Sequence, residues 1–363
     1  MFPMVLTFGV IARDCEFPAF ESERNDEDGA SIFSRFKRCY DKQYAPALEV
    51  AHRDTFLMNL KTIHEKNSEN MLDGKSMRLG VNRFADLSST EFTSRYLMRN
   101  MTAERQGYGR GGAIGRQTPA RQSASAGTGN TTCDRSGRYA TPVKDQGSCG
   151  SCYVFATVAA AEGSIAFWAN ESPVALSEQQ ALMCCDNKKC GGGFPGHVAD
   201  CLTSHHVVAS MDALPYNVSA LAAGAQCPFE TSSGSFAYER VGFGGGAVTT
   251  KYIASGEDAI KTVIGDEQCD YMNAPAVAAC IDASHPSFQL YKSGVYEEAA
   301  CTTKTDHCIS IWGWGKSDSG EDFWIIKNSW GDAWGLDGYM HMKRGVSMCA
   351  LGYYDAYYFD IPA

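Results

Sequence analysis

Two cysteines three residues apart stand where this sequence could carry nucleophilic or redox chemistry. Cys149 and Cys152 lie in the run Gln-Gly-Ser-Cys-Gly-Ser-Cys-Tyr. The spacing suits a redox pair or half of a zinc site. However, the apolar, Ala-rich residues 154–168 contain no proline and predict a buried helix that begins at or just after Ser151. Cys152 would then lie in the first helical turn, where the helix dipole favours a thiolate, so it is a candidate nucleophile.

The same run resembles the active-site loop of one protease family. Residues 149–153 match Cys-Gly-[Ser/Ala]-Cys-[Trp/Tyr], the signature around the nucleophile of papain and cathepsins. His307 heads a predicted strand, and it and Asn328 lie in segments that resemble the histidine and asparagine segments of papain-family cysteine proteases. Residues 328–339 read Asn-Ser-Trp-Gly-Asp-Ala-Trp-Gly-Leu-Asp-Gly-Tyr, which is the most specific motif in the chain.

The resemblance implies a role for each residue of the site. Cys152 attacks the scissile carbonyl, and His307 forms an ion pair with it and later protonates the leaving amine. Asn328 orients the imidazole by accepting a hydrogen bond from it. Trp330, which we also assign to substrate binding, shields that hydrogen bond from water. The Gln146 side chain and the backbone N–H of Cys152 would hold the oxyanion. The alternative for Gln146 is a solvated loop glutamine.

A second pair of motifs precedes this region. Six residues at steps of three or four share one face of a predicted helix: Glu49, Arg53, Phe56, Asn59, Ile63 and Asn67. A second motif follows at Gly80, Asn82, Phe84 and Asp86. Both resemble the inhibitory propeptides of cathepsin L-like proteases. The resemblance implies that the chain's own propeptide is an intramolecular inhibitor whose extended tail runs through the cleft against the substrate direction. The alternative for the helix alone is a solvated amphipathic helix.

The chain divides into four parts on composition and motif content. Residues 1–20 form a weak or truncated signal segment, or result from a misassigned start of translation. Residues 21–104 are the helical inhibitory prodomain. Residues 105–132, rich in Gly, Ser and Arg, are a flexible linker suited to activation cleavage, or a passive spacer. Residues 133–363 form the catalytic domain.

The catalytic domain is predicted to have a helical half and then a β-rich half. Short apolar strands with glycine turns begin at about residue 236. The fold class is therefore α+β, and the resemblance implies the two-lobed papain-like fold with a cleft between a helical lobe and a β-barrel-like lobe.

The resemblance also suggests substrate contacts. Gly193 resembles the glycine whose backbone pairs with substrate, and Phe194 and Pro195 resemble the wall of the main specificity pocket. By alignment, Cys280 and Tyr354 line the same pocket. Ordinary core packing is the alternative for all of these residues.

The fifteen cysteines favour an oxidising compartment, and their odd number requires an unpaired thiol. The resemblance implies the disulfides Cys149–Cys190, Cys184–Cys227 and Cys301–Cys349. Cys185 is an alternative to Cys184, and a zinc site at residues 184, 185 and 190 is the rival interpretation. The remaining cysteines, among them Cys280 and Cys308, are unassigned.

Three features depart from the family pattern. Tyr153 replaces the usual tryptophan, and Cys308 follows the candidate histidine where a small apolar residue is usual. His307 also lies farther from Cys152 than the usual interval of about 130–150 residues. We place the extra residues between Cys227 and Asp282, in surface loops.

Composition adds general limits. The net charge of −10 and the absence of a dense basic cluster argue against a nucleic-acid partner. No apolar run reaches membrane-spanning length, so no membrane span is expected. Four Asn-x-Ser/Thr triplets, at Asn100, Asn130, Asn170 and Asn217, are consistent with a glycoprotein that is secreted or lysosome-like or vacuolar. We expect a monomer that acts on protein or peptide substrates without a metal or cofactor.

The leading hypothesis is a cysteine endopeptidase, a peptide hydrolase made as a zymogen. An exopeptidase with one end of the cleft blocked is the alternative within the same family. However, the histidine pair at residues 205 and 206 lacks a cysteine-closed insertion and is interpreted as a surface turn. A non-catalytic binding homologue and a propeptide-type inhibitor are the competing non-enzymatic hypotheses, and the complete set of Cys152, His307 and Asn328 argues against both.

Overall fold

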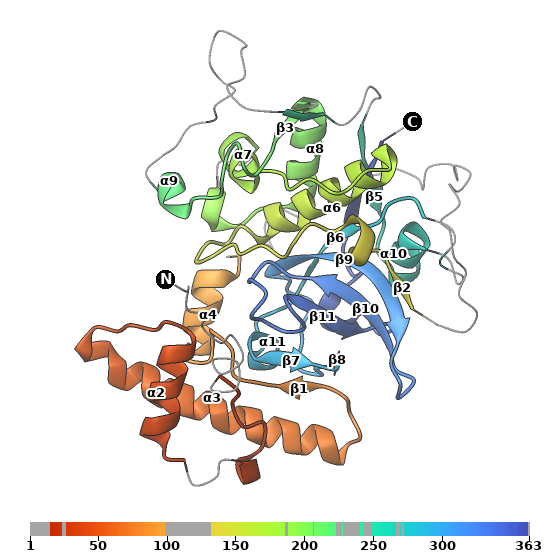
Figure 1. Cartoon of the computed structure of the whole chain (residues 1–363). Helices are drawn as coiled ribbons and strands as arrows, with labels where there is room; N and C mark the ends of the chain where they lie inside the picture. Colours follow the sequence, from red (N-terminus) through yellow and green to blue (C-terminus); the bar gives the residue numbers. More distant parts are fainter. Residues whose placement is uncertain are drawn as a thin grey trace, which may run out of the picture.

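The protein is described here from a computed structural model, which covers residues 15–23, 27–98, 132–185, 188–205, 207–222, 227, 240–242, 248–265, 269 and 272–361. An N-terminal helical unit lies beside a larger body, which consists of a helical lobe and a sheet lobe (Figure 1). Residues 105–131 of the predicted linker, residues 1–14 of the predicted signal segment, and the asparagines at 100 and 130 lie outside the described residues.

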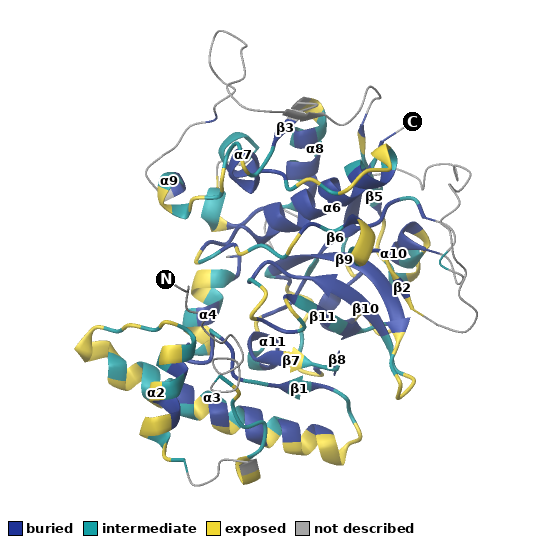
Figure 2. Ribbon diagram, viewed as in Figure 1, coloured by how far each residue is buried: buried dark blue, intermediate teal, exposed yellow. Residues whose placement is uncertain are grey.

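The N-terminal unit is built on two packed helices, α2 (Gly29–Cys39) and α3 (Pro46–Leu72), and side-chain caps begin α2 and α4 (Ser89–Tyr96). Its other elements are η1 (Glu21–Glu23) and β1 (Arg78–Leu79). The Asp28 side chain caps α2, and Ser88 and Glu91 form a reciprocal capping box on α4. Phe36, Phe56 and Ile63 are fully buried where α2 crosses α3. The opposite face of α3 is exposed (Figure 2).

The helical lobe surrounds one long central helix. Its elements are α5 (Ser136–Tyr139), α6 (Cys152–Ala169), α7 (Glu178–Cys184), η4 (Lys189–Gly191), α8 (Pro195–His205), β3 (Val207–Ala209), α9 (Val218–Ala222) and β4 (Arg240–Gly242). The predicted start of α6 at or just after Ser151 is confirmed. In length and composition α6 could cross a membrane, contrary to the sequence-based expectation, but 83% of it is buried inside the protein, as expected for a core helix.

The sheet lobe contains an eight-stranded sheet. Its strands are β2 (Cys133–Asp134), β5 (Thr249–Ile253), β6 (Val277–Ile281), β8 (Val295–Tyr296), β9 (His307–Lys316), β10 (Asp322–Lys327), β11 (Tyr339–Lys343) and β12 (Ala356–Asp360). The strand order is β5-β12-β6-β9-β10-β11-β8, and β2 pairs with β9. The lobe also contains α10 (Glu257–Ile264), α11 (Pro286–Gln289), β7 (Tyr291–Ser293) and η5 (Met348–Ala350). The predicted order of a helical half and then a β-rich half is confirmed.

The two lobes meet where α6 packs against β9. Gly163 on α6 allows this close approach, because a Cβ atom there would lie 2.7 Å from the Trp312 ring. Trp312 is fully buried and belongs to the same apolar core as the residues of α6. This packing places the first turn of α6 opposite the start of β9.

The disulfides include the three pairs that the resemblance implies: Cys149–Cys190, Cys184–Cys227 and Cys301–Cys349. Four more pairs were not predicted: Cys15–Cys39, Cys133–Cys269, Cys185–Cys201 and Cys280–Cys308. The alternative bridge through Cys185 is therefore wrong, and the sulfurs of the rival zinc site are all in disulfides. Among the described residues, Cys152 is the free cysteine.

Candidate active site

Cys152 begins α6 and faces the start of β9. Its side chain is fully buried, and the backbone N–H of Cys308 donates a hydrogen bond to its Sγ atom at 3.4 Å. Cys308 is the residue after His307, so this contact brings the candidate nucleophile and the candidate base from the two lobes together. Tyr153, which replaces the usual tryptophan, is buried and donates its hydroxyl to the carbonyl of Lys189 at 3.0 Å.

The imidazole of His307 is held by Asn328. His307 Nε2 lies 2.8 Å from Asn328 Oδ1, and both side chains are buried. A carboxamide oxygen only accepts hydrogen bonds, so Nε2 carries the proton and donates it. Nδ1 is buried and has no hydrogen-bond partner among the described residues, which leaves it available to a proton from elsewhere. The Trp330 ring lies 4.5 Å from the imidazole, centroid to centroid, and is fully buried.

Gln146 is oriented toward the N-terminal unit rather than toward solvent. Its Nε2 atom donates to the carbonyl of Tyr96, at the end of α4, at 2.9 Å and to the carbonyl of Cys149 at 2.8 Å. Its Oε1 atom accepts from the Ser329 hydroxyl at 2.6 Å. The Tyr96 carbonyl of the N-terminal unit thus accepts a hydrogen bond from the Gln146 amide, which the sequence predicts as a donor to the oxyanion.

The three residues from this point onward, Tyr96 to Met98, form what we call the cleft segment. Leu97 and Met98 are buried, and the Met98 N–H donates to the carbonyl of Asp306 at 2.7 Å. Gly192, with φ of +96°, leaves room for Met98, because a Cβ there would lie 2.8 Å from the Met98 Cβ atom. The cleft segment therefore lies between loops of both lobes and covers Cys152.

Burial under the cleft segment sets the charge state of the pair. Burial raises the pKa of the Cys152 thiol to about 12, although the Cys308 N–H opposes this. Burial lowers the pKa of His307 to about 4, and its hydrogen bond with Asn328 opposes that shift. Both groups are therefore neutral near pH 7. The thiolate expected from the helix dipole is disfavoured while the site is covered, because desolvation outweighs the dipole.

Comparison with known protein families identifies this arrangement. Residues 130–359 match the model of the papain family of cysteine proteases. The chain belongs to the papain family of cysteine proteases. Residues 33–92 match the cathepsin propeptide inhibitor domain. The chain is thus a peptide hydrolase of the thiol protease class that carries its propeptide, with the papain-like fold.

Relatives share both parts. The chain is 31% identical to cysteine proteinase 3 of Dictyostelium discoideum, over 94% of each chain. It is 30% identical to cathepsin S of Bos taurus, over 89% of this chain and 90% of the relative. Among solved structures, procathepsin L 3 from the larval midgut of Tenebrio molitor has a TM-score of 0.72, with 26% identity over 92% of this chain and 99% of the other. A stem bromelain precursor has a TM-score of 0.71, with 25% identity over 93% and 100%.

The helix motif of this papain-family propeptide finds partners within the prodomain. Phe56 and Ile63 are fully buried, and Lys37 pairs with Glu49. Asn59 Nδ2 donates to the carbonyls of Ala85 and Leu87, and Asn67 Nδ2 donates to those of Ala19 and Leu79. Arg53 pairs with its exposed neighbour Asp54. The polar residues on the buried stripe therefore fix the chain that follows α3.

The second motif docks the prodomain on the catalytic domain. The Gly80 N–H donates to the carbonyl of Leu290, and Asn82 Nδ2 donates to the carbonyl of Gln289. Phe84 lies edge-on to Trp330 at 5.7 Å. Asp86 stays inside the prodomain, where it accepts from Lys42 and Tyr44.

The predicted specificity residues lie in two places, at the start of α8 and near His307. Gly193 is buried next to Gly192, while Phe194 is half-buried beside Pro195, which begins α8. The Tyr354 hydroxyl donates to the carbonyl of Thr303, in the loop before His307. Cys280, expected as an unassigned pocket residue, is instead bonded to Cys308, because the two face each other across β6 and β9. This disulfide pairs two of the cysteines that the sequence left unassigned.

Sequence reasoning missed two residues that position Gln146, the predicted oxyanion donor. The Tyr216 hydroxyl donates to the Gln146 carbonyl at 2.8 Å and lies 3.0 Å from the Ser151 hydroxyl. Ser329 orients the Gln146 amide through the hydrogen bond to Oε1. The sequence could have indicated the role of Ser329, since this residue lies inside the Asn-Ser-Trp motif. It gave little indication of the role of Tyr216, because Tyr216 contacts a loop more than sixty residues away in sequence.

Proposed function

We propose that this papain-family zymogen matures into an endopeptidase in which Cys152 is the nucleophile and His307 its acid and base. Asn328 orients the imidazole, and Gln146 with the Cys152 N–H stabilises the oxyanion. The hydrogen bond between His307 and Asn328, next to a Cys308 amide aimed at the thiol, supports these roles. The unpartnered Nδ1 atom is then the acceptor for the thiol proton once the site opens.

The observation that carries the endopeptidase proposal is the position of the prodomain chain in the cleft. Phe92 on α4 packs on Trp330, which lies against His307. The Met98 N–H donates to the Asp306 carbonyl, and the Met98 side chain lies against Gly192. The prodomain chain therefore runs past Cys152, from Trp330 to Gly192, and we infer that substrate can extend in the same way. A cleft that accepts chain on both sides suits cleavage within a polypeptide, whereas an exopeptidase needs one side closed.

The proposed activation is cleavage within residues 105–132, followed by release of the cleft segment. Until then, the Tyr96 carbonyl occupies the Gln146 amide, so substrate cannot use the oxyanion site. We further propose a monomer in a secretory, lysosome-like or vacuolar compartment. Seven disulfides and exposed sites at Asn170 and Asn217 support an oxidising route.

The test compares the purified chain with its Cys152→Ala variant at about pH 4–6 in a mild reductant. The wild type should shorten to a fragment that begins within or near residues 105–132 and should cleave a long peptide at internal bonds. The variant should do neither. Release of terminal residues alone would contradict the endopeptidase proposal, and an inert wild type would contradict the zymogen proposal.

A further inference from the structure

The disulfide between Cys280 and Cys308 lies at the stem where the chain leaves β6 and returns in β9. The two residues are directly opposite in the antiparallel register, and Ile281 and His307 form the next pair. Cys308 is almost fully buried. The covalent link is therefore one residue away from the imidazole.

This stem carries two groups that face the nucleophile. One is the His307 ring, and the other is the Cys308 N–H, which donates to Cys152 Sγ at 3.4 Å. The positions of the imidazole and of this N–H both depend on how His307 and Cys308, the first two residues of β9, pair with β6. A shift of the β9 start along or away from β6 would move the base and the amide donor together.

The segment that connects β6 to β9, residues 282–306, is long and also contacts the prodomain. Its β7 strand pairs with β1, and Gln289 Nε2 donates to the carbonyls of Phe84 and Leu87. Docking and release of the prodomain thus act on a segment that ends directly before His307. A rigid stem isolates the position of the imidazole from those events.

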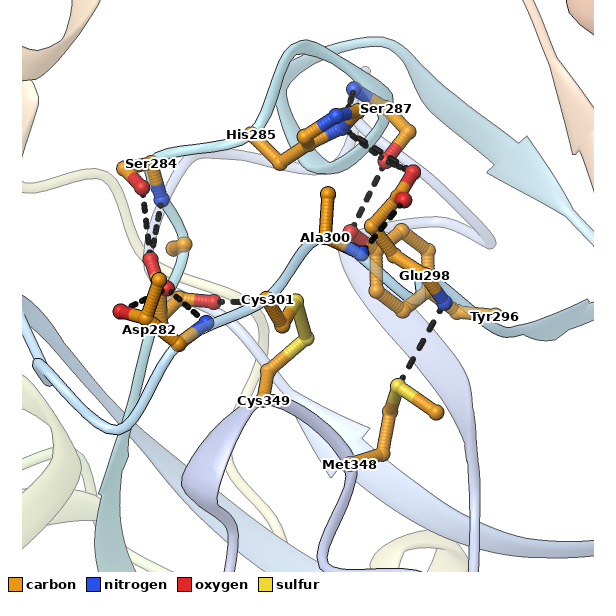
Figure 3. Close-up of a disulfide and its surroundings, with 12 residues drawn as sticks. Asp282, Ser284, His285, Ser287, Tyr296, Glu298, Ala300, Cys301, Met348 and Cys349 are labelled. Carbon is orange, nitrogen blue, oxygen red and sulfur yellow. Dashed lines mark hydrogen bonds and ion pairs between the residues drawn. A yellow bond between two sulfur atoms is a disulfide. The ribbon is translucent and has the colours of Figure 1, made fainter.

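The last part of residues 282–306 is held by a second disulfide and by hydrogen bonds (Figure 3). Cys301 is bonded to Cys349, and the Asp282 carboxylate accepts from the N–H and hydroxyl of Thr302. Hydrogen bonds then lead back to the stem, where the Asp306 N–H donates to the carbonyl of Ile281. The Cys280–Cys308 bond is the covalent link at the strands themselves.

We propose that the Cys280–Cys308 disulfide is a positioning element of the catalytic site, which holds His307 and the Cys308 amide in register with Cys152. The inference rests on the proposed roles of Cys152 and His307. It assigns a function to the two cysteines that the sequence left unexplained.

The kinetic test replaces the pair in the Cys280→Ala/Cys308→Ala variant. The matched control is Cys185→Ala/Cys201→Ala, which removes a disulfide of the helical lobe outside the catalytic contacts. After activation and active-site titration, the first variant should lose about tenfold or more in kcat, with a smaller change in KM, because misplaced reacting groups slow the chemical step. The acid limb of its pH profile should also move, since that limb reports the Cys152–His307 pair. The control should keep both.

Equal kcat values and pH profiles in both variants, with lower thermal midpoints alone, would show a purely structural disulfide and overturn the inference. A second measurement does not depend on proteolysis. In the full-length zymogen at neutral pH, amide hydrogen exchange of residues 307–310 should be faster in Cys280→Ala/Cys308→Ala than in wild type. Unchanged exchange would overturn the inference even if the wild type cleaves peptides. A wild type that cleaves nothing would instead contradict the proposed function.

Discussion

At the scale of single residues, the zymogen keeps the proposed reactive pair, Cys152 and His307, neutral by covering both side chains. Cys152 and His307 are both fully buried, one with a raised and one with a lowered pKa. Each shift opposes formation of the thiolate–imidazolium pair. Removal of the cleft segment lets water reach both groups and so removes the desolvation that produces the shifts. We therefore propose that the prodomain inhibits the enzyme electrostatically as well as sterically.

The first prediction concerns the reactivity of the Cys152 thiol. Because its pKa is raised to about 12 in the zymogen, the thiol stays protonated below pH 9 and should react with iodoacetamide at least about 100-fold more slowly than free cysteine. The rate should rise with pH. After activation, rapid alkylation should appear at mildly acidic pH. Mass spectrometry measures the label, and Cys152→Ala should take up none. Equal rates before and after activation would contradict electrostatic masking.

The second prediction concerns the orientation of the base. Asn328→Ala removes the oxygen that accepts from His307 Nε2, so the imidazole can rotate away from Cys152. The expected result is a loss of about 10²-fold in kcat with a small change in KM. Asn328→Asp retains an acceptor oxygen and should lose less. Steady-state kinetics, with enzyme concentration set by active-site titration, measure kcat and KM. A wild-type kcat in Asn328→Ala would exclude the orienting role.

At the scale of elements, α4 and the loop before it carry the prodomain aromatic side chains that pack on Trp330. Phe92 is almost fully buried and meets Trp330 edge-on at a centroid distance of 5.1 Å, while Phe84 packs on both rings. Trp330 in turn covers the His307 ring. One aromatic cluster therefore links prodomain docking to the shield of the imidazole.

The third prediction follows from this cluster. Phe92→Ala should weaken docking of the prodomain by about 3 kcal/mol, since truncation of a buried phenylalanine loses apolar contact and leaves a cavity. The variant should therefore mature at a higher pH than wild type in a timed gel assay. Leu48→Ala, on the exposed face of α3, is the control and should behave as wild type because Leu48 is 54% exposed. Identical maturation of the Phe92 variant would contradict docking through α4.

At the scale of the whole molecule, a buried ionic network ties the chain before α6 to both lobes. The Lys144 Nζ atom donates to the carboxylates of Glu162 on α6 and Glu178 on α7. Lys327 at the end of β10 donates to the carbonyl of Thr141, whose hydroxyl donates to Glu162. Burial raises the pKa of Glu178 to about 7, although Lys144 opposes the shift. The network lies directly behind Asn328, in a pocket lined by both lobes.

The fourth prediction is the cost of breaking this network. Lys144→Met leaves two buried carboxyl groups without their cation and should lower the free energy of unfolding by about 3–5 kcal/mol. Addition of Glu162→Gln and Glu178→Gln removes the uncompensated charges and should recover much of the loss. Urea unfolding in the Cys152→Ala background, which avoids self-digestion, measures both. A Lys144→Met variant as stable as its parent would show that the ion pairs of Lys144 add nothing to stability.

Much of this protein is readable from local sequence. The start of α6, the Cys152–Tyr153 signature and the Asn328–Trp330 motif depend on residues a few positions apart, and backbone geometry then determines which of them share a turn. The order of a helical half and then a β-rich half also follows from local pattern, whereas the two-lobed fold and the propeptide motifs were expected from the family resemblance. The six helix-motif residues also share one face of α3, as their spacing predicts.

Other features depend on which distant segments meet. The pairing of Cys280 with Cys308 requires the register of β6 on β9, and Cys133–Cys269 joins residues 136 positions apart. The neutral state of Cys152 and His307 likewise requires the cleft segment to exclude water from them. Sequence determined which residues could react, because reactivity belongs to the side chain and its local turn. Tertiary structure decided their charge and their alignment, because desolvation and strand register arise only when the prodomain and the two lobes pack together.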